Sequence, residues 1–455
     1  MNRSLNKEIL RLALPSILAN ITVPIVGMVD TAVAGHLPAS GGAGAAEFIG
    51  AISIGSMLFT LLYWSFGFLR IGTGGLAAQA FGRGDLRDSG RIFCRGLALA
   101  LAVAAGVFLI QWPYLKAVMF FTHGSPAVET LASRYFFIRI WAAPATLSLM
   151  VSRGWFIGMQ DSVRSMWADL VVNVVNIVAS IVLALGIGDW EGLGFDGIAL
   201  GTVIAQYSGL AYSIIATKLR YGGRVFGTLT RDDLHGLFKG TGGFIRMNLD
   251  YFGRSVFFMV IYIGYTMIAA EQGDLMLACS SIMMQLLMLF SYFTDGFAYA
   301  GEALTGRFIG AKDREGTVNA VKYVFVWSMA VAVAFVGIYL ASGVPLLRLM
   351  TDDGGVVAAC RRFLPWLILM PPLGCAAFTW DGIYLGATAS RGVFLAMAGA
   401  AVSFIIVWFA CRLIFNPEGP LAIHCLLAAY FAHLIFRTVY LSARYRRDVL
   451  ERWFG

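Results

Sequence analysis

The stretch GLAAQAFGRGD at residues 75–85 has a second version in the same chain, ALTGRFIGAKD at residues 303–313. The two align without a gap at a constant offset (310 − 82 = 228), and this offset also carries RGWFIGMQDS (153–162) onto DGIYLGATAS (381–390). Glycine and proline have specific structural uses in helices, so their coincidence at one offset indicates an internal duplication.

The composition around these repeats is that of an integral membrane protein. The chain has 455 residues, of which 59% are hydrophobic and 13% charged, and its mean hydropathy is +0.75. A soluble protein is about 45–50% apolar and about 25% charged, and one helical crossing of a bilayer needs roughly 20 apolar residues. We therefore expect twelve transmembrane helices, near residues 9–35, 47–80, 92–121, 130–159, 165–187, 193–218, 241–270, 275–308, 318–347, 357–387, 391–415 and 420–443.

The repeat offset spans six of these helices. Because six is an even number, both halves keep the same orientation and are related by an axis along the membrane normal. The sequence therefore predicts an all-α integral membrane fold, with two pseudo-symmetric six-helix bundles around a central cavity. We expect an N-terminal bundle over 1–218, a cytoplasmic linker over 219–240 and a C-terminal bundle over 241–455.

The net charge of +8 follows the topology of the chain. Basic residues cluster on alternate connections, whereas PASGGAGAAEF (38–48), GDWEGLGFDG (188–197) and AEQGD (270–274) contain no Lys or Arg. The positive-inside rule then places both termini in the cytoplasm, and a nucleic-acid partner is excluded on this ground. Three arginines around the connection from the ninth to the tenth span are the main exceptions, namely Arg348, Arg361 and Arg362.

Neither a metal or cofactor site nor a set of enzyme motifs is apparent. The six cysteines are scattered, without a CxxC pair and without histidines at ligand spacing, which favours packing roles over a metal site or a disulfide. No HExxH, DDxxD or GxSxG motif occurs, so we expect no enzymatic activity.

An aspartate interrupts the first apolar span. Asp30 lies in GMVDTAVAG (27–35), where a carboxylate costs about 3 kcal/mol on insertion scales unless it faces a protein interior or a wet cavity. The alternative is that Asp30 merely lies near the outer surface, since His36 follows it closely.

The fifth span has a polar stripe that favours the first interpretation. Asp169, Asn173, Asn176 and Ser180 recur on one face of an otherwise apolar helix, and Ser180 and Thr202 of the next span lie at a depth similar to that of Asp30. These residues predict a shared polar pocket. The alternative for the stripe is interhelical hydrogen bonding without a ligand.

Together these motifs are similar to those of a known family. The strings FLRIGTGGLAAQAFGRGD (68–85), FTDGFAYAGEALTGRFIGAKD (293–313) and DGIYLGATASR (381–391), together with LALPSILANITVPIVGMVDTAVAGHL (12–37), resemble the multidrug and toxic compound extrusion (MATE) family in its DinF-like branch. The likeness covers nearly the whole chain. It implies a cation-driven antiporter that expels amphipathic, often cationic, compounds.

The resemblance also implies which residues couple transport to a cation. Many members place a second aspartate four residues after the position matched by Asn176, and that aspartate, the first aspartate and a threonine form a cation site. Here Asp30, Asn176 and Thr202 match, but the second carboxylate is replaced by Ser180. A sodium ion needs several oxygens with enough negative charge, whereas a proton needs one desolvated carboxylate, so we favour proton coupling.

Three further features are candidates for a role in the transport cycle. Pro15 and Pro24 give the first span a hinge, because each lacks a backbone N–H. A polar face in the second half, formed by Asp295, Tyr299 and Glu302, is either a second proton or substrate site or a hydrogen-bonded hinge. The repeat places Arg153 over Asp381, which predicts an inner charge pair with a structural role.

The sequence therefore predicts a monomeric, proton-coupled multidrug antiporter of the bacterial inner membrane, with small amphipathic or cationic drugs and the lipid bilayer as its partners. The alternative is a lipid-linked oligosaccharide flippase of the same superfamily, which would need a cationic cavity for pyrophosphate. The charges at membrane depth in the first half are mainly acidic or neutral, apart from Arg70 and Arg139.

Overall fold

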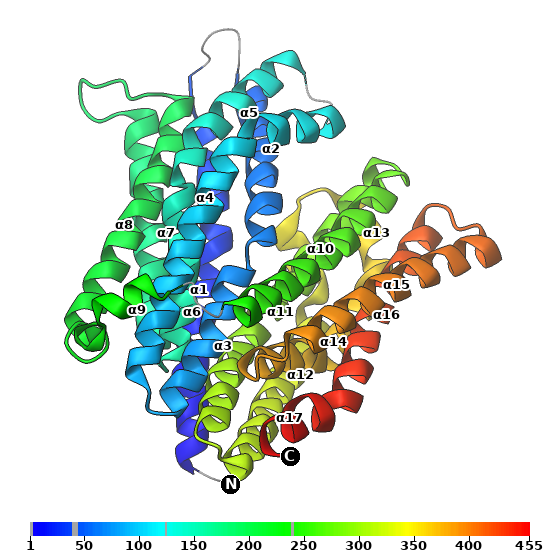
Figure 1. Ribbon diagram of the computed structural model, residues 1–455. Coiled ribbons are helices and arrows are strands. Elements are labelled where there is room, and N and C mark those ends of the chain that lie inside the picture. Colours follow the sequence, from blue (N-terminus) through cyan, green and yellow to red (C-terminus); the bar gives the residue numbers. More distant parts are fainter. Residues whose placement is uncertain (1–2, 39–43, 123–124, 238–240) are drawn as a thin grey trace. The chain divides into compact units, whose positions relative to one another are not determined.

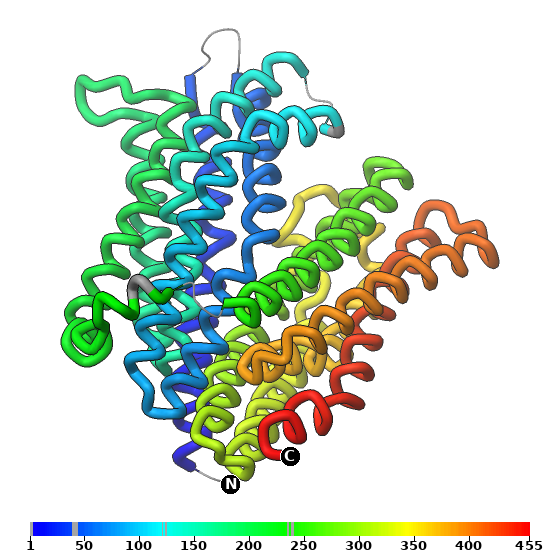
Figure 2. The backbone as a smooth tube through the Cα atoms, viewed as in Figure 1, coloured from blue at the N-terminus to red at the C-terminus, as the bar shows by residue number. Residues whose placement is uncertain are grey.

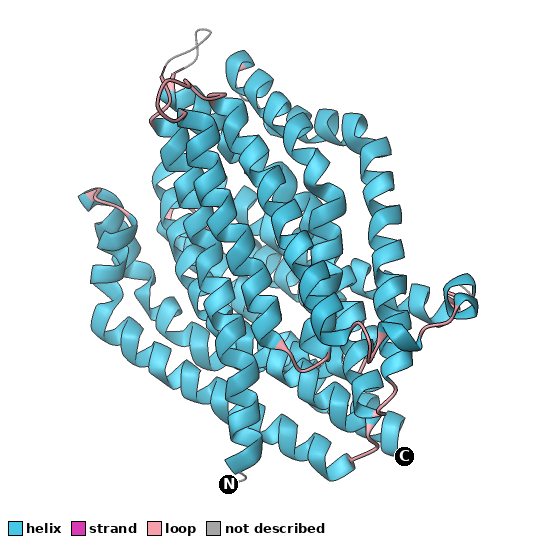
Figure 3. Cartoon of the chain, turned by 90° about the vertical axis from the view of Figure 1, so that its left-hand side faces the viewer, coloured by secondary structure: helices cyan, strands magenta, loops and turns pink. Residues whose placement is uncertain are grey.

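Helices make up almost all of the regular structure. The computed structural model describes residues 3–38, 44–122, 125–237 and 241–455. Within these ranges turns and loops connect the helices, and the one β feature is an isolated bridge between Ile187 and Trp190 (Figure 3). The predicted linker over 219–240 ends in residues 238–240, which lie outside the described residues.

The prediction of twelve spans is confirmed by the described helices. Twelve segments are long and apolar enough to cross a bilayer, where a helix is favoured because it satisfies its backbone hydrogen bonds internally. In the first half the helices are α1 Arg3–Gly35, α2 Ala45–Ser65, α3 Phe68–Gly82, α4 Leu86–Thr122, α5 Pro126–Arg139, α6 Ala143–Gly158, α7 Ser162–Leu185, α8 Phe195–Tyr221 and α9 Arg231–His235. In the second half they are α10 Gly242–Ala270, α11 Asp274–Gly310, α12 Arg314–Met350, α13 Gly354–Cys360, α14 Leu364–Gly386, α15 Ser390–Phe415, α16 Pro420–Tyr445 and α17 Arg452–Phe454.

Some spans contain a break. A turn separates α2 from α3. One short 3₁₀ segment, Ile140–Ala142, joins α5 to α6, and another, Arg361–Phe363, joins α13 to α14. Pro144 and Pro365 lie in the first turns of α6 and α14, where the missing N–H costs little. Such breaks expose backbone groups inside a span, which is tolerated when protein surrounds them.

The chain forms two compact units. One comprises Met1–Ile17, Phe81–Gly84 and Gly242–Gly455, and the other comprises Leu18–Ala80 and Asp85–Thr241. The second unit, which we call the Asp30 unit, contains α4 to α8 as a series of neighbouring helices (Figure 1). Its apolar core joins α2, α5 and α8 around Phe59 and Phe136.

The duplication is visible in the backbone. Six of the eleven described residues with positive φ form pairs 228 positions apart: Gly84 and Lys312, Gln160 and Thr388, Gly188 and Asn416. Close helix contacts repeat in the same way, because a Cβ on Gly154 would overlap the carbonyl of Arg70, and one on Gly382 would overlap the carbonyl of Ala298. The repeat predicted from the sequence therefore extends to local turn geometry and helix packing.

The segment after α8 docks on α4. Figure 2 follows the chain from α8 into this segment, drawn in green. Arg87 forms an ion pair with Asp233 at 2.7 Å, and Arg95 Nε donates to the carbonyl of Leu237 at 2.6 Å. Hydrogen bonds from the backbone of Thr230 and from the guanidinium of Arg87 lower the pKa of Asp233 to about 2.

Candidate functional site

Asp30 is buried in the Asp30 unit. It lies one turn before the end of α1, and 7% of its surface is exposed. The charge of Arg139 from α5 acts on its carboxylate, and the hydroxyl of Ser180 from α7 lies beside it. Burial of an isolated carboxylate is costly, so these two neighbours are the local compensation for its charge.

Asn176 and Thr202 adjoin these residues and complete a buried polar cluster, at the place where the sequence predicts a pocket. Asn176 Nδ2 donates to Thr202 Oγ1 at 3.0 Å, and the Thr202 hydroxyl donates to the carbonyl of Ile198 at 3.3 Å. Asn176, Ser180 and Thr202 are all buried. The structure thus brings the four sequence-predicted site residues into one unit, with Asp30 beside Ser180 and Asn176 bonded to Thr202.

Close packing of α7 against α8 explains this arrangement. Small residues recur at every fourth position along α8 and are buried, from Gly197 through Gly201 and Ala205 to Gly209. A Cβ on Gly201 would lie 2.7 Å from the amide nitrogen of Ser180 and 2.8 Å from its Oγ. Small residues at this spacing let two membrane helices approach closely, which sets Ser180 against α8.

The inner part of the α7 stripe bonds to other helices. Asp169 forms an ion pair with Arg153 of α6 at 2.5 Å, and Asn173 Nδ2 donates to Thr22 Oγ1 of α1 at 2.6 Å. For these two residues interhelical bonding is a sufficient explanation. The ligand-binding interpretation therefore applies to the outer part, Asn176 and Ser180.

Arg139 is the charged neighbour of Asp30 that the sequence reasoning did not assign to the site. Its guanidinium donates to the hydroxyl of Tyr135 at 2.9 Å and lies 4.7 Å from the ring centroid of Phe59. Tyr135 is fully buried, and its hydroxyl lies near that of Thr202. An arginine inside an apolar span is costly and normally has a partner, which is the sequence signal that points to it.

Tyr135 fits because α2 leaves space for it. A Cβ on Gly55 would lie 2.5 Å from Cδ1 of the Tyr135 ring. The hydroxyl of Tyr135 thereby accepts from Arg139 in the neighbourhood of Thr202. The pocket thus joins a carboxylate, a guanidinium, a phenol, an amide and two aliphatic hydroxyls.

Three buried oxygens of this cluster lack a hydrogen-bond partner among the described residues: Asp30 Oδ1, Asn176 Oδ1 and Ser180 Oγ. Buried oxygens of this kind are normally satisfied, so the site is suited to a proton, a water molecule or a cation. Clusters of three or more His, Cys, Asp or Glu side chains able to hold a metal are absent from the described part of the chain.

The hinge prolines lie within one continuous helix. α1 runs through Pro15 and Pro24 without interruption. The division between the two compact units falls in this helix directly after Ile17. Thr22, close to Pro24, is also the residue that accepts the bond from Asn173. The hinge role of the two prolines stays a prediction.

The second-half candidates belong to the other unit. Glu302 is fully buried on α11, and its charge acts on Tyr251 of α10. The charge of Asp295 acts on the neighbouring Tyr292. Tyr299 lies between Asp295 and Glu302 along the helix and is half-buried. Their shared polar face stays a prediction as a transport site.

Both members of the predicted inner charge pair have partners in their own unit. Arg153 binds Asp169, as described above. Asp381 Oδ2 accepts from Arg254 and from Arg437, the latter at 2.5 Å. A pair between Arg153 and Asp381 is therefore not needed to compensate either charge.

Comparisons with known proteins agree with this fold. A family model described as MatE matches residues 15–182 and 252–414, one stretch in each half. The chain is 31% identical to DNA damage-inducible protein F of Escherichia coli, over 99% of this chain and 95% of the relative. It is 25% identical to the chloroplastic Protein DETOXIFICATION 44 of Arabidopsis thaliana, over 91% of this chain and 77% of the relative.

Solved structures show the same fold. A MATE protein in the bent conformation matches with a TM-score of 0.81 at 17% identity, covering 98% of this chain and 96% of that one. An outward-facing multidrug resistance MATE family transporter also gives 0.81, at 16% identity, covering 99% and 97%. With the family match, these findings confirm the predicted DinF-like resemblance and the expected absence of enzymatic function. The chain belongs to the MATE family of membrane transporters.

Proposed function

We propose that this protein is a proton-coupled antiporter that exports amphipathic, often cationic, compounds across the bacterial inner membrane. Both termini would lie in the cytoplasm, and the protein would act as a monomer. The observation that supports the proposal most directly is the buried Asp30 carboxylate with one guanidinium, that of Arg139, acting on it.

The charges of the pocket favour a proton as the coupling ion. Sodium would have to displace water in a site that offers one carboxylate and already contains the positive charge of Arg139. A proton binds to one oxygen and needs no further negative ligands. Ser180, at the place of the second carboxylate in many relatives, adds an oxygen but no charge.

Arg139 also gives the proton a way to expel the substrate. While Asp30 is ionised, its charge offsets Arg139 and the pocket accepts a cationic compound. When a proton neutralises Asp30, the charge of Arg139 is left uncompensated and repels the bound cation. Proton and substrate then favour opposite states of the transporter, which is sufficient for antiport.

A flippase function is supported less well. Binding of a pyrophosphate would need excess positive charge, and in the Asp30 pocket the charge of Arg139 is offset by that of Asp30. We therefore retain drug antiport as the proposed function.

The competition between proton and substrate is directly measurable. Addition of a cationic dye to the detergent-solubilised protein in weakly buffered solution should release protons, up to one for each dye bound. The variant Asp30→Asn should release none while it remains folded. Equal proton release from both proteins would contradict the assignment of Asp30.

A further inference from the structure

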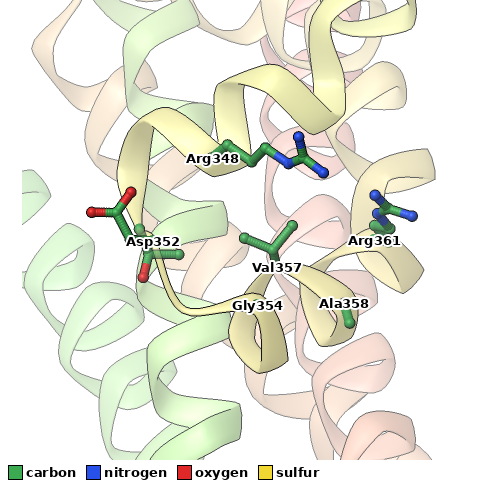
Figure 4. Close-up of a pocket in the computed structure, with 7 residues that line it drawn as sticks. Arg348, Asp352, Gly354, Val357, Ala358 and Arg361 are labelled. Carbon is green, nitrogen blue, oxygen red and sulfur yellow. The ribbon is translucent and has the colours of Figure 1, made fainter.

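A second pocket lies in the unit that contains α10 to α17, where α12 ends and α13 begins. It has a volume of about 450 Å³, and its lining includes Arg348, Thr351, Asp352 and Arg361. Figure 4 shows the guanidinium groups of Arg348 and Arg361 on one side of Val357 and the carboxylate of Asp352 on the other. Two cationic groups thus share one hollow of the surface.

These two arginines lack an anionic partner. Neither forms an ion pair within the described part of the chain. The nearby Asp353 is engaged elsewhere, because its carboxylate caps α13 by accepting from the amides of Gly355 at 2.7 Å and Val356 at 3.1 Å. The pocket therefore has excess positive charge, which a bound anion would neutralise.

The topology of the chain does not explain these charges. Arg348 and Arg361 flank a connection that the distribution of basic residues places outside the cell. Basic residues on an outer connection oppose the bias that orients membrane proteins. Their presence together at a pocket is better explained by a ligand at the outer surface of the membrane.

The neighbouring surface of α12 favours a lipid as that ligand. Arg348 is followed by Leu349, which is 80% exposed, and it lies at the end of an exposed apolar face that includes Val333 and Leu340. Such a face lies against acyl chains, with Arg348 at the level of the headgroups. A guanidinium binds phosphate through two parallel hydrogen bonds, so two of them suit one phosphate group.

We propose that this pocket binds the phosphate of an anionic phospholipid in the outer leaflet. The inference is independent of the coupling ion and of the drug site. It rests on the proposed orientation of the chain, with both termini in the cytoplasm, but it concerns the unit that does not contain Asp30, so either site can fail alone.

Native mass spectrometry of the delipidated full-length protein would test the inference. Phosphatidylglycerol should bind at least about tenfold more tightly than phosphatidylcholine, and the double variant Arg348→Gln with Arg361→Gln should lose about tenfold in phosphatidylglycerol affinity. Arg412→Gln is the matched control, because Arg412 is an exposed arginine at the end of α15 outside the pocket. It should bind phosphatidylglycerol like the native protein.

Three outcomes would overturn the proposal: equal affinity in the double variant, an equal loss in the Arg412→Gln control, and displacement of the lipid by inorganic phosphate at the same concentration. The last result would identify a site for free phosphate. If the double variant does not fold, the pair Arg348→Lys with Arg361→Lys decides the question. The lysine pair keeps both charges but loses the planar guanidinium groups that bind phosphate through two parallel hydrogen bonds. Its affinity for phosphatidylglycerol should therefore be lower than that of native protein, and an unchanged affinity would count against the proposal.

Discussion

A single buried carboxylate, with the charge of a single guanidinium acting on it, sets the electrostatics of the proposed drug-export site. Asp30 and Arg139 come from α1 and α5, and the guanidinium donates to Tyr135, whose hydroxyl lies near Thr202 of α8. Because the two charges offset each other, any ligand that changes one of them changes the electrostatics of the whole pocket. Protonation of Asp30 is the smallest such change.

Removal of the charge of Arg139 should make the site respond to sodium. In proteoliposomes at fixed pH, Arg139→Gln should let a sodium gradient drive drug transport, with a half-saturating sodium concentration on the order of tenfold lower than that of native protein. Arg134→Gln is the control, since Arg134 lies on the same helix and its partner is Asp196. If the sodium dependence of drug transport by Arg139→Gln were the same as that of native protein, the proposed role of Arg139 would be contradicted.

A second carboxylate should act in the same direction. Ser180→Asp places negative charge beside Asp30, where a cation can bridge the two groups. Transport assayed at constant pH should then rise with sodium concentration. An unchanged sodium response would show that the number of carboxylates does not select the ion.

The sequence predicted one half of this site and not the other. Asp30, Asn176, Ser180 and Thr202 could be found because polar residues stand out in apolar spans and recur at helical spacing. Arg139 and Tyr135 could not be assigned to the pocket, since their contacts depend on how α5 packs against α2 and α8. Those contacts join residues far apart in the sequence, and no periodicity encodes them.

At the scale of elements, the pair α7 and α8 positions the site. Small residues along α8 bring its backbone against Ser180, and the hydrogen bond from Asn176 to Thr202 joins the two helices at the same level. The apolar runs predicted both helices correctly. The breaks at α2/α3 and α5/α6 were not predicted, because the apolar run continues across each of them.

Added bulk between α7 and α8 should destabilise the protein. Gly201→Ala would place a Cβ 2.7 Å from the amide nitrogen of Ser180, and such overpacking costs about 1–3 kcal/mol. Its thermal unfolding midpoint in detergent should fall by several degrees. Gly106→Ala in α4, where a Cβ meets no atom within 4 Å, should leave the midpoint unchanged or raise it slightly. Equal midpoints for the two variants would contradict the close packing.

The docked segment after α8 should loosen in acid. The pKa of Asp233 is about 2 in the folded protein against 3.8 ordinarily, so the ionised carboxylate stabilises docking above about pH 4 and this contribution is lost as the pH falls toward 2. Pepsin should therefore cleave the segment faster at pH 2 than at pH 4. All cleavage rates are divided by the rate at which pepsin cleaves an unfolded substrate at the same pH. On this scale Asp233→Asn should be cleaved equally fast at pH 2 and pH 4, whereas Asp232→Asn should behave like native protein. If the normalised cleavage rate of native protein were the same at pH 2 and pH 4, the proposed role of Asp233 would be contradicted.

At the scale of the whole molecule, the duplication is the main organising feature. Its signature in the sequence was the set of glycines at one offset, and the structure shows why they are retained, since Gly154 and Gly382 make equivalent close contacts and residues with positive φ recur at the same spacing. The division of α1 between the two compact units could not be predicted, because the apolar run through Ile17 shows no change in composition. That division falls two residues after Pro15.

The most direct test of proton-coupled export is drug transport driven by an imposed pH gradient in proteoliposomes without sodium. Native protein should accumulate a cationic dye against its gradient, whereas Asp30→Asn, reconstituted at the same density, should transport at least about tenfold more slowly because its site cannot exchange a proton. Asp189→Asn, outside the membrane spans, is the control and should match native protein. Equal pH-driven transport by native protein and Asp30→Asn would contradict the central claim that Asp30 couples the proton to the drug.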